Sequence, residues 1–146
     1  IGDTPPCLIA LDATLVLAAA DGEREIAIED FFLDYRKTDL RPGEVIRTIR
    51  IPKLTDRQSF RTYKVSKRYD QDISAVIGGF RLTFDGDRVA EARIAAGAGA
   101  KIAEDFSPLT DHRATAEYRT RVAANLCTRL YRDLSGTEAE LEVVRL

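Results

Sequence analysis

Two charged residues and one charged loop supply the side chains with which this sequence can bind a polar ligand. Asp3 lies in the Gly/Pro-rich segment 1–6 (IGDTPP), where a carboxylate can cap a turn or accept hydrogen bonds from a ligand. Lys64 lies in an alternating segment and is followed by the loop 67–72, the densest cluster of mixed charges in the chain. The Asp3 pattern fits a turn or helix cap equally well. The Lys64 cluster also fits a solvated loop with weak ion pairs. The residue pattern alone therefore indicates a polar loop and no reaction.

The residue types most often used for catalysis and metal binding are scarce. His112 is the only imidazole, and without a serine or cysteine nucleophile motif it is expected to be a surface residue at a helix entry. Cys7 and Cys127 lack the spacing of a zinc or iron–sulfur site and are expected to act as small hydrophobic residues. The sequence predicts no catalytic residue and no metal centre held by this chain alone.

The glycine-rich segment 97–100 (GAGA) resembles part of a dinucleotide-binding loop. It lacks the third glycine of that motif, and it follows an expected antiparallel hairpin where the motif would open a crossover helix. The segment is therefore interpreted as an ordinary loop.

Composition excludes several classes of partner. The chain has 146 residues, 45% of them hydrophobic, and a formal net charge of −2, which gives no electrostatic reason to bind nucleic acid or anionic lipid in bulk. No apolar run approaches the roughly 20 residues that cross a bilayer. We expect a soluble, cytoplasmic protein, because the cysteines are unpaired and no export signal is present. The start at Ile1 without Met suggests a piece of a longer protein.

Alternation of apolar and polar residues predicts the elements that must position Asp3. Residues 8–28 are interpreted as two strands, and residues 29–32 as a short helical or loop turn. A third strand is expected over 45–51 and ends at Pro52, which has no amide hydrogen for a sheet ladder. The polar segment 53–59 is interpreted as a linker between two parts of the chain.

The second part is expected to hold a small antiparallel sheet and a helix. Strands are predicted over 60–65 and 75–84, and the turn at 85–87 joins the latter to a strand over 89–95. A helix follows, because apolar residues recur every four positions and Gly136 can end it. Its apolar stripe is Tyr118, Val122, Leu126 and Leu130, flanked by Ala114, Ala123 and Tyr131; Thr115 or Asp111 can cap it, and its outer side carries Arg119, Arg121, Arg129 and Arg132.

Four segments, in chain order, resemble the FAD-binding component of the molybdenum hydroxylases. Segments 1–13 and 31–52 are similar to the end of that family's FAD-binding domain. Segment 63–74 (YKVSKRYDQDIS) resembles the opening of the C-terminal domain shared by carbon monoxide dehydrogenase flavoproteins and xanthine dehydrogenases. Segment 108–123 resembles the last helix of that domain. Within the family, 34–38 and 67–73 are most similar to the small subunits of bacterial xanthine dehydrogenases.

The resemblance implies the fold class and the division of the chain. The fold expected is α+β: the end of an FAD-binding domain over 1–55, then a small antiparallel sheet packed against a C-terminal helix over 56–135. The tail 136–146 is left unassigned. Relative to the family, an internal segment near 97–101 is expected to be missing, because residues 101–104 follow the glycine-rich turn almost at once.

The resemblance also implies cofactors and partners. In xanthine dehydrogenases of this type, xanthine or hypoxanthine is oxidised at a molybdenum cofactor in a large partner subunit. Electrons then pass through [2Fe–2S] clusters, in an iron–sulfur domain of the same polypeptide as the flavin domain, to FAD and to NAD. The chain is thus expected to be the FAD-carrying part of a hetero-oligomeric oxidoreductase, inactive as an isolated fragment, with no nucleic-acid or membrane partner.

Individual site residues follow from the same resemblance. Asp3 matches an aspartate beside the FAD polyol or ribose, Ile46 matches an apolar residue near the isoalloxazine, and Lys64 matches a lysine close to the flavin ring. Arg68 and Asp70 match a segment on the side from which nicotinamide approaches. Two alternatives remain open: a flavoprotein whose complex oxidises carbon monoxide or an N-heterocycle, and a non-catalytic module that docks the FAD domain to its partners.

Overall fold

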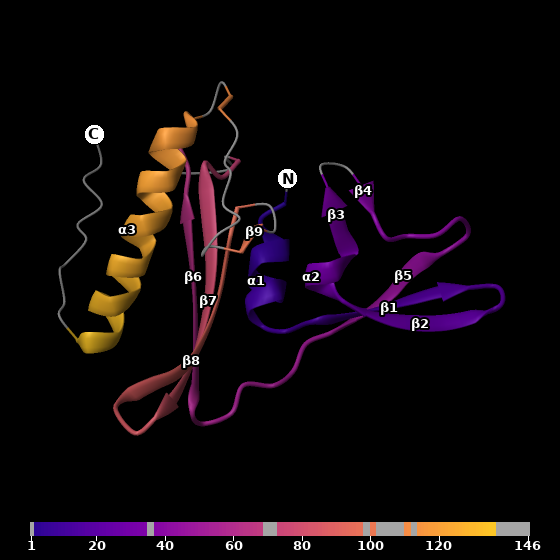
Figure 1. Ribbon diagram of the computed structural model, residues 1–146, viewed down its shortest axis with the longest axis horizontal. Helices are drawn as coiled ribbons and strands as arrows, with labels where there is room; N and C mark the ends of the chain where they lie inside the picture. The colour runs from indigo at the N-terminus through magenta and orange to yellow at the C-terminus, as the bar shows by residue number, and fades with distance from the viewer. Residues whose placement is uncertain are drawn as a thin grey trace.

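The computed structural model describes residues 2–34, 37–68, 73–97, 100–101, 110–111 and 114–136. Figure 1 shows three layers: helix α3 on one side, a four-stranded sheet beside it, and helix α1 and a second sheet beyond. The elements are α1 (Thr4–Ala10), β1 (Thr14–Ala19), β2 (Gly22–Ala27), α2 (Ile28–Phe31), β3 (Phe32–Asp34), β4 (Lys37–Thr38), β5 (Val45–Arg50), β6 (Gln58–Val65), β7 (Val76–Asp85), β8 (Arg88–Ala96), β9 (Ala100–Lys101) and α3 (Ala116–Ser135). The expected α+β class is confirmed.

The first sheet has the strand order β2-β1-β5, all antiparallel. Its central strand β1 buries Leu15, Val16 and Leu17, which explains why this strand reads as a continuous apolar run. Leu15 and Leu17 pack with residues of α1 and α2, among them Leu8 and Phe31, in one apolar cluster. Burial of this cluster fixes α1 beside the start of the first sheet.

Arg24 of β2 holds the turn that leads into β5. Its guanidinium donates hydrogen bonds to both carboxylate oxygens of Glu44 and to Asp39. Hydrogen bonds from Arg24, together with the Arg41 amide, lower the pKa of Glu44 to about 2, so the carboxylate stays ionised in ordinary buffers. The turn is thereby tied to β2. It leads directly into β5, the strand that carries Ile46.

The second sheet has the strand order β6-β7-β8-β9, and α3 covers one of its faces (Figure 1). Phe80 of β7 is fully buried there and packs with Leu126 and Leu130 of α3. Tyr63 of β6 joins the same cluster, and its hydroxyl donates a hydrogen bond to Asp133 of α3. Burial raises the pKa of Tyr63 to about 12, and the bond to Asp133 adds to this effect.

Helix α1 covers the opposite face of the same sheet at very short range. A Cβ atom on Gly79 of β7 would lie 2.7 Å from the Pro6 carbonyl oxygen and 3.0 Å from the Cys7 Cα atom. Only glycine allows a helix backbone to approach a strand this closely. Successive residues of a strand face opposite sides of the sheet. Gly79 and Arg81 therefore face α1, and Phe80 faces α3.

Several expectations were wrong in detail. Residues 4–10 form α1, whereas the sequence suggested a Gly/Pro turn followed by strand; proline is well tolerated in the first helical turn, and Pro5 and Pro6 stand there. The Arg119 side chain is only 11% exposed and donates to Asp111, so it is not on the outer side of α3. Tyr118 and Tyr131 are 47% and 72% exposed, so neither is packed, although the four-residue spacing placed Tyr118 on the apolar stripe and Tyr131 on its flank. Ala100 begins β9 and is not part of a loop.

The predicted start and end of α3 are confirmed. The Thr115 hydroxyl accepts a hydrogen bond from the Tyr118 amide, which is the N-cap arrangement, and Gly136 ends the helix with a φ of 67°. His112 and residues 137–146 lie outside the part of the chain that the structure describes.

The Gly79 contact predicts a steep cost for a single methyl group. Gly79→Ala should lower the free energy of unfolding by about 1–3 kcal/mol, because the new Cβ meets backbone atoms of α1 that cannot rotate away. Gly2→Ala is the matched control, since its Cβ would meet only side-chain atoms of Pro5, at 3.3 and 3.7 Å. Urea denaturation of the two variants should show the larger loss at position 79; equal losses would contradict the close helix–strand contact.

Candidate functional site

The candidate site lies where the N-terminal end of α1 meets β6. Asp3 is the N-cap residue of α1, and Lys64 is the penultimate residue of β6. The Lys64 Nζ atom lies 2.8 Å from Asp3 Oδ2, although the two residues are 61 positions apart. The structure thus brings together the two residues that the sequence singled out from separate segments.

Ser74 completes the coordination of the carboxylate. Its hydroxyl donates a hydrogen bond of 2.6 Å to Asp3 Oδ1, and the residue is buried just before β7. Each carboxylate oxygen of Asp3 therefore has its own donor, one cationic and one neutral. Sequence reasoning did not select Ser74 as a site residue, because a serine after a charged loop has no spacing pattern that links it to position 3.

Cys7 and Thr62 form a second contact beside this pair. The Cys7 Sγ atom lies 3.3 Å from the Thr62 hydroxyl, and it also donates a long 3.7 Å hydrogen bond to the Asp3 carbonyl oxygen. Thr62 and Lys64 stand two positions apart on β6 and so face the same side of the sheet. The half-buried Cys7 thus joins α1 to β6 on the side of the sheet that carries Lys64.

Electrostatics keep the Asp3 carboxyl ionised. Burial alone raises its pKa, but the hydrogen bonds from Lys64 and Ser74 and the Lys64 charge outweigh that effect and lower the pKa below its ordinary value of 3.8. A carboxylate that accepts two hydrogen bonds and faces an ammonium group is the form this geometry favours. The site therefore presents a fixed negative charge beside a fixed positive one.

The pair retains capacity for a further polar group. The Asp3 and Lys64 side chains are 39% and 43% exposed, so both reach solvent. A carboxylate offers about four lone-pair positions and an ammonium group three donors, which exceed the contacts made here. Hydroxyl donors such as those of a ribose or polyol fit Asp3, and an anionic acceptor fits Lys64. The expected neighbourhood of FAD is chemically compatible with these residues.

Ile46 does not join this cluster. It lies on β5 of the first sheet, opposite Leu17, and is 46% exposed. Figure 1 shows β5 on the far side of α1 from β6. Arg68 is exposed, and its carbonyl oxygen accepts a hydrogen bond from the Ser66 hydroxyl. Asp70 lies outside the residues described.

The lowered pKa of Asp3 gives a pH-dependent contribution to stability. Because the folded pKa lies below the unfolded value of 3.8, the contribution is complete only well above that value and is lost as the pH falls through the folded pKa. Both side chains are more than one third exposed, so we expect at most about 1 kcal/mol. Asp3→Asn should therefore destabilise the protein at pH 7, and by less at pH 3, which lies below the unfolded pKa. Thermal unfolding at both pH values measures this, with Asp85→Asn as the control; a pH-independent difference would contradict the pair.

Comparison with family models and known proteins agrees with this architecture. Residues 1–54 match the FAD binding domain in molybdopterin dehydrogenase, and residues 61–103 and 96–134 match the CO dehydrogenase flavoprotein C-terminal domain. The chain is 40% identical over 100 residues to a xanthine dehydrogenase of Blastobotrys adeninivorans, covering 66% of this chain and 7% of that protein. It is 39% identical over 84 residues to a xanthine dehydrogenase of Emericella nidulans, covering 57% of this chain and 6% of that protein.

Solved structures share the fold at lower identity. Carbon monoxide dehydrogenase from Hydrogenophaga pseudoflava superposes with a TM-score of 0.78 at 24% identity, over 88% of this chain and 54% of that one. Quinoline 2-oxidoreductase from Pseudomonas putida 86 gives a TM-score of 0.75 at 22% identity over similar shares. The chain thus spans about half the length of these structures and a small part of the curated xanthine dehydrogenases. The chain belongs to the FAD-binding components of the molybdenum hydroxylases.

Proposed function

We propose that the protein containing this chain binds FAD, with Asp3 and Lys64 beside the cofactor. The observation that carries this proposal is the 2.8 Å contact between the two side chains, which come from segments matched by two different family models. Asp3 retains acceptor positions and Lys64 retains donors. Together they are suited to a ligand that carries both hydroxyl and anionic groups.

In this proposal the residues of the chain bind and orient. Bound FAD supplies the redox chemistry, which amino-acid side chains do not provide. Asp3 accepts hydrogen bonds from hydroxyl groups, and Ser74 holds the acceptor oxygens in place. Lys64 places positive charge where negative charge develops, a contribution that strengthens as water is excluded. Ile46, Arg68 and Asp70 are proposed as further contacts, the last two towards NAD.

We further propose xanthine or hypoxanthine as the substrate of the complete complex and NAD as its electron acceptor. Relatives named xanthine dehydrogenase, at 32–40% identity in five different organisms, support this choice. The complex would then include a molybdenum-cofactor subunit and an iron–sulfur domain with [2Fe–2S] clusters, placed in the cytoplasm. No helix among the described residues is long and apolar enough to span a membrane.

A second candidate substrate class has its own support. The glyceraldehyde dehydrogenase medium chain of Sulfolobus acidocaldarius aligns over 91% of this chain and 57% of its own length, although at 23% identity. The xanthine dehydrogenase alignments cover at most 66% of the chain.

The proposed division of the chain near residue 55 and the missing segment near 97–101 stay predictions. The two overlapping matches at 61–103 and 96–134 support the missing segment.

The FAD site is tested by titration of the intact apo-flavoprotein with FAD. Lys64→Met and Asp3→Asn should each raise the dissociation constant about tenfold, because each removes a charged hydrogen-bonding group from the cofactor's surroundings. Lys53→Met, in the exposed linker, is the matched control and should leave the constant unchanged. Unchanged affinity in both site variants would reject their role and favour the docking-module alternative.

The substrate class is tested on the complete complex. Reduction of NAD should be fastest with xanthine or hypoxanthine, since relatives that are 40% and 39% identical are named xanthine dehydrogenase. Glyceraldehyde and quinoline serve as the competing substrates, and oxygen as the competing acceptor. Preferential oxidation of glyceraldehyde would establish the second candidate, and no NAD reduction with any substrate would contradict the proposed acceptor.

A further inference from the structure

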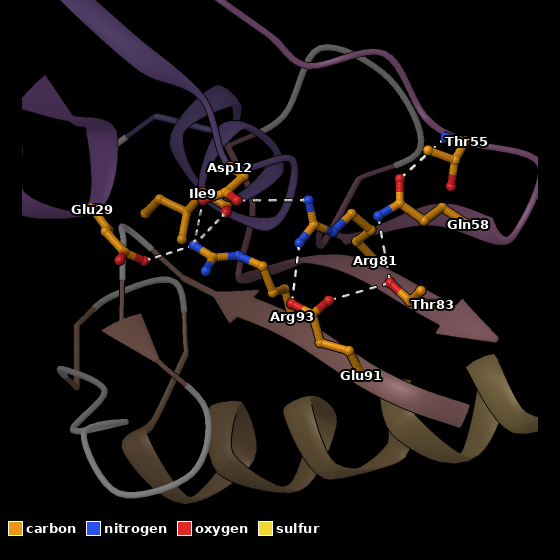
Figure 2. Close-up of polar contacts among 9 residues, drawn as sticks. All are labelled: Ile9, Asp12, Glu29, Thr55, Gln58, Arg81, Thr83, Glu91 and Arg93. Atoms are coloured by element: carbon orange, nitrogen blue, oxygen red, sulfur yellow. Dashed lines mark hydrogen bonds and ion pairs between the residues drawn. The ribbon is translucent and has the colours of Figure 1, made fainter. Parts of the chain in front are cut away.

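A charged cluster holds the other end of α1, away from the candidate site. Figure 2 shows Arg81 of β7 and Arg93 of β8 between the carboxylates of Asp12, Glu29 and Glu91. Arg81 and Arg93 stand directly opposite each other in the sheet register. Two like charges in such a pair destabilise a sheet unless neighbouring charges offset them. Here the carboxylates of Asp12, Glu29 and Glu91 offset the repulsion between the two arginines.

The contacts of the two arginines converge on the chain after α1. Arg93 donates to Glu29 at 2.8 Å, to the Ile9 carbonyl oxygen at 3.3 Å, and lies 3.3 Å from Asp12 Oδ1. The Arg81 side chain is 8% exposed and lies 3.8 Å from Asp12 Oδ2 and 3.3 Å from Glu91. Each carboxylate oxygen of Asp12 thus faces a different guanidinium group, as Figure 2 shows.

The backbone at Asp12 is unusual. Its φ of 62° is the only positive value at a non-glycine position in the described part of the chain. Residues other than glycine occupy this region at a cost, which persists only where surrounding contacts enforce it. The Nε atoms of Arg81 and Arg93 are also buried without a hydrogen-bond partner among the described residues, a further cost. Both costs indicate that the cluster fixes a position more than it adds stability.

Helix α1 connects this cluster to Asp3. The helix has seven residues, so it is about 10 Å long, and it touches β7 through the backbone at Gly79. A helix this short is not stable by itself, so its position depends on tertiary contacts: the apolar cluster with the first sheet, the Gly79 contact, and the charged contacts at its two ends. Movement of the Asp12 end would rotate the helix about the Gly79 contact and displace Asp3 from Lys64.

We propose that Asp12, Arg81 and Arg93 are positioning residues for the candidate site: they anchor the C-terminal end of α1 on the sheet and thereby hold Asp3 against Lys64. The link to cofactor binding rests on the proposed function, whereas the link to the Asp3–Lys64 contact does not. The three residues act through α1 and touch no ligand.

The first test measures the Asp3–Lys64 contact without cofactor. Acetic anhydride labels lysine amines, and a lysine held in an ion pair reacts slowly. In the intact apo-flavoprotein, Asp12→Asn should raise the labelling rate of Lys64 about threefold to tenfold, as read by mass spectrometry. Asparagine tolerates the same backbone region, so the change removes charge and leaves the turn intact. Asp3→Asn sets the upper limit of the increase.

Two controls separate positioning from general loosening. Asp85→Asn removes the carboxylate of an exposed pair with Arg57 and should leave Lys64 labelling unchanged. Cys127, which packs against the apolar cluster under α3, reports on general opening when its thiol is alkylated in a parallel sample. Faster labelling of both Lys64 and Cys127, or no increase at Lys64 in Asp12→Asn, would overturn the proposal. Glu29→Gln, which removes one Arg93 partner, provides a milder second variant and should give a smaller increase at Lys64.

The second test links the cluster to the cofactor. Asp12→Asn should weaken FAD binding by about the same factor as it raises Lys64 labelling, because both depend on one displacement. If Asp3→Asn weakens FAD binding and Asp12→Asn does not, the positioning proposal fails and the FAD site stands. If Lys64 labelling rises in Asp12→Asn while no variant alters FAD binding, the positioning role stands and the proposed function fails.

Discussion

The close approach of helix α1 to strand β7 is the constraint on which the arrangement depends. At Gly79 the helix backbone lies against the strand with no room for a Cβ atom. This contact places one short helix between two sheets, with the apolar residues of α1 packed towards the first sheet. Helix α1 thereby joins the segment matched to the FAD-binding domain to the segment matched to the C-terminal domain.

Polar contacts at both ends of α1 then decide where the helix lies on the sheet. At one end Asp3 meets Lys64 and Ser74, and at the other Asp12 meets Arg81 and Arg93. Exposed ion pairs add at most about 1 kcal/mol each, whereas a buried leucine or phenylalanine adds about 1.5–3 kcal/mol. The apolar clusters therefore stabilise the fold, and the charged contacts choose one position among several that apolar burial alone would allow.

The family relationship supports conclusions about the fold more strongly than conclusions about the reaction. Structures of carbon monoxide dehydrogenase and quinoline 2-oxidoreductase share the fold at 24% and 22% identity, although they act on unrelated compounds. Substrate choice thus does not follow from this fold. What the structure of this chain shows is a pair of opposite charges, Asp3 and Lys64, held together by contacts from α1, β6 and Ser74.

Local patterns in the sequence predicted strands over 75–84 and 89–95, which the structure has at 76–85 and 88–96, and the C-terminal helix with its cap and stop, because alternation, four-residue spacing and turn glycines act over a few residues. The family was identified from the resemblance of four longer segments. Local patterns also marked Asp3 and Lys64 as candidates. Only the tertiary structure decided that residues 4–10 form a helix, that Ser74 completes the Asp3 site, and that Arg81 and Arg93 face each other. These depend on strand register and on packing between segments some 60 to 80 residues apart, which no local pattern encodes.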